Sequence, residues 1–289
     1  METNLDSVRL SGPINPGYRP SPRGPVLGRI GSLDVRLAAN RKEVDAAQAL
    51  RYQVFVEEMG ATLPADAMRA RRDFDAVDSY CDHLLVLDTA RDGDPEDQIV
   101  GTYRLLTQSS AECHSGFYSQ SEFDVGALVA RNPDKRFLEL GRSCVLPEYR
   151  TRRTIELLWQ GNWAYCLANG IDVMFGCASF PGDRPYAHAL ALSFIHQVAA
   201  ADADWSVRAV AGRGLDMDMM PSEAIQARAA LAMMPPLVKG YLRVGAMTST
   251  EAVVDPAFRT TDILVILPVK RIAERYVNHY GADAGRFAA

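Results

Sequence analysis

An acidic residue stands inside an otherwise apolar run at the centre of the chain. Glu139 lies between Leu138 and Leu140 in the segment FLELGRSCVL. A carboxylate buried there without a partner would be costly, so Glu139 is expected either to pair with Arg142 or Arg104 or to have a raised pKa. A carboxyl group with a raised pKa can accept a proton from an amine nucleophile. A satisfied glutamate–arginine pair is the simpler of the two interpretations.

The segment around this run is strongly basic. Between Arg131 and Arg153 it holds seven basic residues and three acidic ones, although the formal net charge of the chain is −5. A strand that leads into a helix N-terminus can bind a phosphate or phosphopantetheine group there. Arg150, Arg152 and Arg153 add positive charge at that place. A solvated basic turn explains the same composition equally well.

A second cluster is acidic and precedes a short apolar run. Its five members lie close together in the sequence: Asp73, Asp75, Asp78, Asp82 and His83. Closely spaced carboxylates can bind a cationic amino group, and the histidine can carry a proton. The ligand spacing of an EF-hand is missing, so no metal site is predicted. The plainer interpretation is that most of these residues face solvent or cap helices, with one or two facing a cleft.

Other catalytic patterns are missing or weak. The sequence has no GxSxG elbow, HExxH, Walker loop or GxGxxG, so hydrolase, zinc peptidase, triphosphatase and dinucleotide-binding interpretations lose direct support. Cys144 is a nucleophile by residue type, but a cysteine in an apolar strand is far more often inert. Five cysteines without a CxxC pair suggest neither a disulfide framework nor a zinc knuckle, and they indicate a reducing compartment.

Length and composition fit a globular protein. The 289 residues are 48% hydrophobic and 23% charged, and the acidic balance argues against a general nucleic-acid binder. Residues 1–29 hold five prolines and are expected to be a flexible leader, with one domain over 30–289. The longest strongly apolar stretch, 263–269, is too short to cross a membrane. We therefore expect a cytoplasmic protein, for which any contact with a membrane would be at the inner face.

Hydrophobic spacing predicts the elements that position these residues. A strand near 31–39 should precede a helix capped by Asn40, and a hairpin should span about 83–108. A strand over 137–146, a helix capped by Thr154 and stopped by Gly170, and a strand over 171–180 should form a βαβ unit. Further helices are expected at 186–200, 221–234, 235–246 and 271–281, and further strands at 205–212 and 261–269.

This order of elements resembles the GNAT acyltransferase superfamily. Within it the chain looks like the bacterial ornithine-lipid N-acyltransferases, which are related more distantly to acyl-homoserine-lactone synthases. The resemblance covers about 31–280 and rests on RYQVFVEEMG with Arg51 and Phe55, RRDFDAVDSYCDHLLV, VGTYRLL, FLELGRSCVLPEYR, MMPPLVKGYLRVGA and FRTTDILVILPV. It implies an α/β fold whose central sheet is mixed and mostly antiparallel, with flanking helices and a C-terminal extension.

The resemblance also implies a reaction. A 3-hydroxyacyl chain would pass from acyl carrier protein to the α-amino group of L-ornithine and give lyso-ornithine lipid, with no metal and no cofactor beyond the acylated carrier. The usual superfamily pyrophosphate loop, Q/R-x-x-G-x-G/A, is altered, because Arg150, Arg153 and Ile155 stand in its places. Glycines let backbone approach phosphate closely. Their loss favours a carrier protein, with one phosphodiester and an acidic surface, over coenzyme A.

The same resemblance suggests a role for each candidate residue. Glu139 would take the proton of the ornithine ammonium, directly or through water, and backbone N–H groups from Ser143 to Val145 would stabilise the oxyanion. Arg142 and Arg104 would orient Glu139 or the substrate carboxylate, and one of the aspartates would hold the side-chain ammonium. The expected catalytic residues are Glu139, Arg142 and Ser143. The expected substrate-binding residues are Arg51, Phe55, Asp75, Asp78, Asp82, His83 and Arg104. The expected donor-binding residues are Val145, Arg150, Arg152, Arg153 and Thr154.

Two further questions stay open at this point. Phe55, Phe117, Trp159 and Trp163 are candidates to line an apolar tunnel for the acyl chain, although core packing is the simpler explanation for each. The rival functions are a synthase that acylates and lactonises S-adenosylmethionine, and a non-catalytic module that binds acyl carrier protein. The missing tryptophan after Gly60 and the long C-terminal portion disfavour the first rival, and Glu139 together with its arginines disfavours the second.

Overall fold

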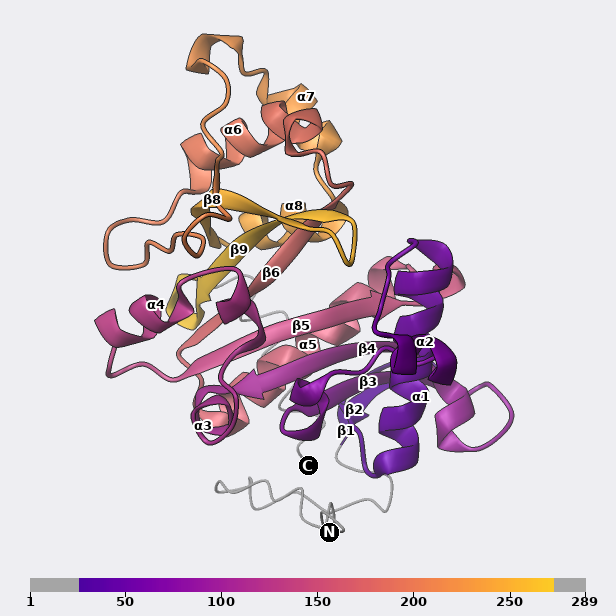
Figure 1. The fold of residues 1–289 in the computed structure, drawn as a ribbon. Coiled ribbons are helices and arrows are strands. Elements are labelled where there is room, and N and C mark those ends of the chain that lie inside the picture. Colours follow the sequence, from indigo (N-terminus) through magenta and orange to yellow (C-terminus); the bar gives the residue numbers. More distant parts are fainter. Residues whose placement is uncertain (1–25, 273–289) are drawn as a thin grey trace.

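The structure, a computed structural model, describes residues 26–272. Its strands form one nine-stranded sheet in the order β1-β2-β3-β4-β5-β6-β9-β8-β7 (Figure 1). The strands are β1 (Val26–Ile30), β2 (Leu33–Leu37), β3 (Asp82–Asp88), β4 (Ile99–Thr107), β5 (Phe137–Val145), β6 (Val173–Pro181), β7 (Leu215–Asp216), β8 (Met247–Asp255) and β9 (Thr260–Pro268). All neighbours in the sheet are antiparallel except β5 and β6. The α/β class and the mixed, mostly antiparallel sheet are as the sequence predicted.

Helices cover both faces of this sheet (Figure 1). The helices are α1 (Arg41–Tyr52), α2 (Ala65–Ala70), α3 (Gln108–Glu112), α4 (Val125–Arg131), α5 (Arg152–Asn169), α6 (Ala189–Ala199), α7 (Ala227–Met233) and α8 (Pro236–Arg243). A buried ion pair between Arg36 of β2 and Glu43 of α1 holds α1 against one face of the sheet. On the other face, Gly161 of α5 lies against Val35 and Leu84, where a Cβ atom would approach both side chains to 3.0 Å or less.

The helix boundaries follow from local hydrogen bonds. Asn40 caps α1 by accepting the Glu43 N–H, as predicted. The cap of α5 is Thr151 and not Thr154, because the Thr151 side chain accepts the N–H of Thr154 three residues later. Gly170 ends α5 in the left-handed region, with φ 59°, which a glycine adopts without strain.

Four expectations differ from the structure. The first strand begins at Val26, inside the segment expected to be a leader, and the predicted leader before it and most of the helix predicted at 271–281 lie outside the described residues. The segment 205–212 is a loop with a single bridge to Phe123. The helix expected over 221–234 shortens to α7, because Ile225 and Gln226 are extended. Strand β8 was not predicted, since MTSTEAVVD does not alternate cleanly between polar and apolar residues.

The boundary between β5 and β6 divides the sheet. These strands are paired at three positions, Phe137↔Val173, Leu138↔Met174 and Glu139↔Phe175. Beyond the third pair they diverge, and β6 continues alongside β9 (Figure 1). Just past the last pair, a Cβ atom on Gly176 would lie 2.1 Å from the carbonyl oxygen of Leu140. Only a glycine permits this close approach of the two backbones.

Candidate active site

A bulge in β5 redirects the side chain of Arg142. Thr102 pairs with Cys144 and Arg104 pairs with Gly141, so Arg142 and Ser143 together face one residue of β4. Arg142 adopts φ 51°, which costs a non-glycine residue on the order of 1 kcal/mol. In a regular strand Arg142 would face away from Arg104, because neighbouring residues alternate. The bulge instead brings the guanidinium of Arg142 to the same face as Arg104.

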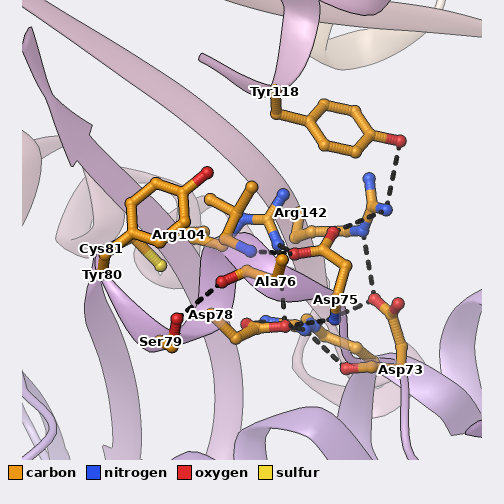
Figure 2. Close-up of polar contacts among 12 residues, drawn as sticks. Asp73, Asp75, Ala76, Asp78, Ser79, Tyr80, Cys81, Arg104, Tyr118 and Arg142 are labelled. Carbon is orange, nitrogen blue, oxygen red and sulfur yellow. Dashed lines mark hydrogen bonds and ion pairs between the residues drawn. The ribbon is translucent and has the colours of Figure 1, made fainter. Parts of the chain in front are cut away.

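Three arginines and three aspartates form one network on this face, which we call the Arg–Asp network (Figure 2). Its contacts are Arg51 Nε to Asp73 Oδ2 at 3.0 Å, Arg51 Nη1 to Asp78 Oδ1 at 2.8 Å, Arg104 Nη1 to Asp75 Oδ1 at 2.7 Å, and Arg142 Nε to Asp73 Oδ2 at 3.1 Å. Positive and negative charges are equal in number within it. The charges of the network therefore balance without a ligand, although Arg104 Nη2 and Asp75 Oδ2 are buried and have no hydrogen bond.

Two members of the network are structural. Asp78 closes a capping box with Asp75 at the start of a 3₁₀ turn, Ala76–Ser79. Burial alone would raise the pKa of Asp78, but the charge and hydrogen bonds of Arg51 outweigh it and hold that pKa well below its usual range. The side chain of Arg51 is 0% exposed, which leaves it no surface to offer a substrate.

Arg142 is the more accessible arginine. Its side chain is 11% exposed, against 3% for Arg104. The guanidinium carbon lies 4.5 Å from the ring centre of Tyr118 and 4.3 Å from that of Phe258, and Nη2 donates to the Tyr118 hydroxyl at 3.2 Å. Two aromatic faces on one cation restrict its motion and favour its charged form. Arg142 is thus a fixed cation at the edge of the network, suited to a carboxylate.

Glu139 is buried at the last residue pair before β5 and β6 diverge. Its carboxylate accepts the backbone N–H groups of Tyr118 and Ser119 at 2.7 Å each, and the Ser119 hydroxyl also donates to it. The expected pair with Arg142 or Arg104 is not formed, because the 3₁₀ turn Tyr118–Ser121 occupies the carboxylate. Burial raises the pKa of Glu139, and the hydrogen bonds from Ser119 and Tyr118 oppose this rise.

The Ser119 hydroxyl is the polar group that links Glu139 to its surroundings. While it donates to Glu139, its oxygen can still accept a hydrogen bond from another group. The thiol of Cys177, on β6, lies near enough to Ser119 for a hydrogen bond between them to influence its pKa. Both groups are buried, with Ser119 1% exposed and Glu139 4% exposed.

An apolar cavity lies on the opposite face, where β5 and β6 separate. It has a volume of about 10 Å³, room for about one water molecule, and is lined by Leu140, Met174, Phe175, Gly176, Tyr241, Val265 and Leu267. The hydroxyl of Tyr241 lies 2.5 Å from that of Tyr103, which is near Ser143. None of the four aromatic residues expected to line an acyl tunnel lines this cavity, although Trp159 packs edge-on against Tyr241.

The remaining expected substrate residues are dispersed. His83 is buried beside Asp78, and burial lowers its pKa to about 4, so it is neutral near pH 7. Asp82 points to the other face of the sheet and accepts the hydroxyl of Tyr165 at 2.6 Å. Phe55 packs edge-on against Phe258 with ring centres 5.6 Å apart. Burial raises the pKa of Cys144 to about 12, so this thiol is not a nucleophile at neutral pH.

The residues expected to bind the donor lie around the N-terminus of α5. Arg150 forms a two-pronged pair with Glu58, at 2.6 and 2.5 Å, and its Nε donates to the carbonyl oxygen of Val145 at 3.1 Å. Arg152 pairs with Glu156 at 2.8 Å, and Arg153 is exposed. Exposed pairs of this kind contribute little free energy, so an anionic partner can replace them. Thr154, in contrast, is fully buried.

Three buried carboxylates that sequence patterns did not predict form a group, which we call the acidic group: Glu122, Asp255 and Asp262. Each is at most 9% exposed. Burial and the two aspartates raise the pKa of Glu122 to about 7, while burial, with a smaller effect of Asp255, raises that of Asp262 to about 6. The signal that singled out Glu139 was present here also, because Asp262 begins an apolar strand. Glu122 and Asp262 are 140 positions apart in the sequence, so only the fold brings them together.

Two clusters have donor atoms within 4.8 Å of one another, as a metal site requires: Asp78 with Cys81 and His83, and Glu122 with Cys177 and Asp262. In the first, Asp78 is committed to Arg51 and burial raises the pKa of the Cys81 thiol strongly. In the second, the Cys177 thiol donates to Glu122 Oε2 at 3.6 Å. Both thiols are protonated at neutral pH, whereas a metal would need thiolates.

Comparison with known proteins places these features in a family. A model of the acetyltransferase (GNAT) domain matches residues 50–160. The L-ornithine N(alpha)-acyltransferase of Agrobacterium fabrum (strain C58) is 62% identical over 261 residues, which are 90% of this chain and 89% of that protein. The protein of the same name from Rhizobium meliloti (strain 1021) is 61% identical over 288 residues, 99% of this chain and 97% of that one.

The fold comparison gives more distant likenesses. The acyl-homoserine lactone synthase LasI is 13% identical and has a TM-score of 0.45, with 87% of this chain and 96% of that chain covered. Within residues 26–272, no helix has both the length and the apolar character to cross a membrane. With 61–62% identity to curated relatives over nine-tenths of its length or more, this chain belongs to the L-ornithine N(alpha)-acyltransferases and is a GNAT-type acyltransferase.

Proposed function

We propose that the protein transfers a 3-hydroxyacyl chain from acyl carrier protein to the α-amino group of L-ornithine, and that the product is lyso-ornithine lipid. The names of the relatives support ornithine as the acceptor. The observation that carries the chemistry is the buried Glu139 with its raised pKa, connected to Ser119 where β5 and β6 separate. The reaction takes the acylated carrier as donor substrate and requires no metal or other cofactor.

Deprotonation of the amine runs through Ser119. An ornithine α-ammonium at the Ser119 hydroxyl gives its proton to the serine oxygen, while the serine proton moves to Glu139. The raised pKa of Glu139 brings its affinity for the proton closer to neutral pH, which favours this transfer. The free amine then attacks the thioester carbonyl, the carbon–sulfur bond breaks, and the surplus proton of the attacking nitrogen passes to the leaving thiolate.

The oxyanion is stabilised by the backbone of β5. Beyond Glu139 no described strand pairs with β5 on the side of β6, and the bulge leaves Arg142 or Ser143 without a ladder partner on β4. N–H groups between Ser143 and Val145 can therefore point at the reacting carbonyl. A preorganised donor of this kind lowers the barrier by roughly 3 kcal/mol.

Arg142 binds the carboxylate of the acceptor. It is the accessible cation beside Tyr118, and Tyr118 is the neighbour of Ser119. A carboxylate on Arg142 would thus place the adjacent α-amine near the proton acceptor, and Arg104 reinforces the positive potential there. Holding two reacting groups at a fixed distance is itself a large part of catalysis.

The donor enters from the N-terminus of α5. The arginines at 150, 152 and 153 meet the acidic carrier surface, and the helix N-terminus receives the single phosphodiester. The product is an amphiphile, so the proposal includes brief contact with the inner face of the membrane, where Arg69, Arg71 and Arg72 supply positive charge. Co-sedimentation with anionic vesicles tests this contact, and no binding at low salt would exclude it.

One assay tests acceptor, donor and base together. Purified protein is given 3-hydroxyacyl carrier protein or 3-hydroxyacyl-coenzyme A, with ornithine, and product formation is followed from pH 6 to 9. We expect turnover with ornithine and the carrier donor, and a loss of at least about 100-fold in Glu139→Gln at every pH. Ser119→Ala should lose about 10-fold or more, because its hydroxyl carries the proton.

The matched control is Glu223→Gln, which makes the same chemical change at an exposed turn. Near-normal turnover of Glu139→Gln across the pH range would remove Glu139 as the base. A lactone formed from S-adenosylmethionine in place of acyl-ornithine would overturn the proposed function.

A further inference from the structure

The Arg–Asp network and the acidic group differ in how far their charges are compensated. The Arg–Asp network pairs three arginines with three aspartates (Figure 2). The acidic group has three carboxylates, and among residues 26–272 a single ion pair reaches it, from Arg213 to Glu122 Oε1 at 3.1 Å. Buried carboxylates without countercharges are unfavourable, so the acidic group calls for protons or for a cation.

The three members of the acidic group come from different elements and converge. Glu122 follows the 3₁₀ turn that holds Glu139, Asp255 ends β8, and Asp262 lies on β9. Ligand atoms of Glu122, Cys177 and Asp262 all lie within 4.8 Å of one another. Asp255 uses one oxygen, Oδ1, to accept the N–H groups of Ala257 and Phe258.

One oxygen of the group has no hydrogen bond. Asp262 is 6% exposed, and its Oδ1 is buried without a hydrogen-bond partner in the described structure. The hydroxyls of Thr260 and Ser179 are close enough to lower its pKa somewhat, yet burial dominates. Ser179, opposite Asp262 on β6, is exposed, so the unpartnered oxygen lies one residue from the surface.

The acidic group adjoins the proposed acceptor site. The phenol of Tyr118 bonds to Arg142 and lies within electrostatic reach of Asp255 and Cys177. The ring of Phe258, which covers Arg142, follows Asp255 by three residues. On the other side, Cys177 contacts both Ser119 and Glu122. Arg142, a fixed cation, and the acidic group therefore flank Ser119, the residue that donates a hydrogen bond to Glu139.

We propose that Glu122, Asp255 and Asp262 form the subsite that receives the side-chain ammonium of the acceptor, and that they select an amino acid with a second amino group. This inference rests on the proposed function and adds the source of its acceptor selectivity. The carboxylate lies on Arg142, the α-amine at Ser119, and the side-chain ammonium in the acidic group. The aspartates that the sequence suggested for this task already have arginine or tyrosine partners.

An ammonium fits better than a metal ion. Burial raises the pKa of Cys177 well above its usual value, so its protonated thiol donates to Glu122. A divalent ion would have to displace that proton, whereas an ammonium can donate to the free oxygen of Asp262 and leave the thiol unchanged.

The test compares two acceptors that differ only in the second amino group. L-Norvaline has the carbon skeleton of ornithine without the side-chain nitrogen. We expect the wild type to use ornithine with a kcat/KM at least 10-fold above that of norvaline. In Asp262→Asn and Glu122→Gln the value for ornithine should fall at least 10-fold, mainly through KM, while that for norvaline stays within about 2-fold. An ornithine-to-norvaline ratio unchanged in both variants overturns the subsite.

Asp134→Asn is the matched control, because it removes one carboxylate charge from a side chain that is 84% exposed. It should leave both acceptors unchanged. Folding of each variant is checked by its thermal transition. Copurification of one equivalent of zinc with the wild type, with its loss in Glu122→Gln, would assign the acidic group to a metal and overturn the proposal.

Calorimetry separates this inference from the proposed function. Ornithine and norvaline are titrated into the protein without any acyl donor, so binding is measured apart from transfer. Tighter binding of ornithine that disappears in Asp262→Asn supports the subsite even if no acyl transfer to ornithine is found, in which case the proposed function alone fails. Equal binding of both amino acids by the wild type rejects the subsite even if ornithine is acylated.

Discussion

Arg142 combines an unfavourable backbone with many favourable contacts. Its left-handed conformation is held because the guanidinium bonds to Asp73 and to Tyr118 and lies between two rings. Arg142→Lys keeps the charge but loses the planar fork and most of the stacking. We expect the KM for ornithine to rise at least 10-fold, with a smaller change in kcat. Steady-state kinetics checks this, and an unchanged KM would show that the carboxylate binds elsewhere.

Arg51 should behave differently, because it is fully buried and bonded to Asp73 and Asp78. Arg51→Met removes one charge and leaves two carboxylates short of a partner, which typically costs about 3–5 kcal/mol of unfolding free energy. Urea denaturation measures this loss. The control is Arg41→Met, which breaks an exposed pair with Asp45 and should cost less than about 1 kcal/mol. A large rise in KM with unchanged stability would contradict the structural role.

The residue types near the network could be recognised from sequence, whereas two decisive partners could not. Glu139 is conspicuous as a carboxylate in an apolar strand, and its neighbours Arg104 and Arg142 are close in the sheet. Ser119 belongs to a turn whose backbone N–H groups donate hydrogen bonds to Glu139, and such a turn has no distinctive sequence. Asp262 joins Glu122 only through the sheet order β6-β9-β8, which local patterns do not reveal.

At the scale of elements, the close approach of β5 and β6 just before they separate depends on Gly176. A methyl group there would meet the carbonyl oxygen of Leu140 at 2.1 Å, so the strands would have to move apart. We expect Gly176→Ala to lower the melting temperature by several degrees and to reduce kcat with long acyl donors. Gly126→Ala, in α4, is the control, because its new methyl group has its nearest contact at 3.8 Å. It should be neutral or stabilising, by up to about 1 kcal/mol. Equal effects of the two substitutions would contradict this account.

The N-terminus of α5 gives a prediction about the donor. Arg152→Glu together with Arg153→Glu reverses the charge of two exposed residues, so the KM for acylated carrier protein should rise at least 10-fold. The KM for ornithine should be unchanged, because the side chains proposed to bind ornithine lie on the face of the sheet that α1 covers. Arg228→Glu, on exposed α7, is the control. The effect on the carrier should weaken at high salt, and a salt-independent effect would argue against electrostatic docking.

Helices and strands whose apolar residues recur at one regular spacing could be predicted from sequence. Those that form only because a neighbouring element pairs with them could not. The helix from Asn40 and the strand 261–269 have regular apolar spacing and the expected boundaries within a few residues. Strand β8 carries threonines, a serine and a glutamate, and it forms because β9 offers it an edge. The loop 205–212 reads as a strand locally but finds no partner beyond one bridge.

At the scale of the whole molecule, the acidic group makes stability depend on pH. Glu122 faces Asp262, Asp255, Arg213 and Cys177, and Asp262 faces Asp255 and Arg142. Folding raises the pKa of Glu122 from 4.5 to about 7 and that of Asp262 from 3.8 to about 6. The folded state therefore binds these protons more tightly than the unfolded state does. Their stabilising effect is complete below about pH 4 and is lost as pH rises through 7.

Urea denaturation at pH 5 and pH 8 tests this dependence. We expect Glu122→Gln with Asp262→Asn to gain stability relative to the wild type on going to pH 8, by on the order of 2 kcal/mol. Saturating ornithine should restore part of the same free energy to the wild type at pH 8. A stability difference that is the same at both pH values would mean that these carboxyl groups titrate normally.

The connectivity of the sheet sets an order of events in time. Strands β1 to β6 are neighbours in the order in which they occur in the chain, whereas β9 is placed between β6 and β8. Contacts close in sequence form faster than distant ones, because less chain entropy is lost in closing them. We expect the first six strands to assemble early during refolding and β9 to join β6 last. Pulsed hydrogen exchange would then protect the amides of β3 before those of β9, so the acidic group, which includes Asp262 of β9, would be the last part of the site to mature.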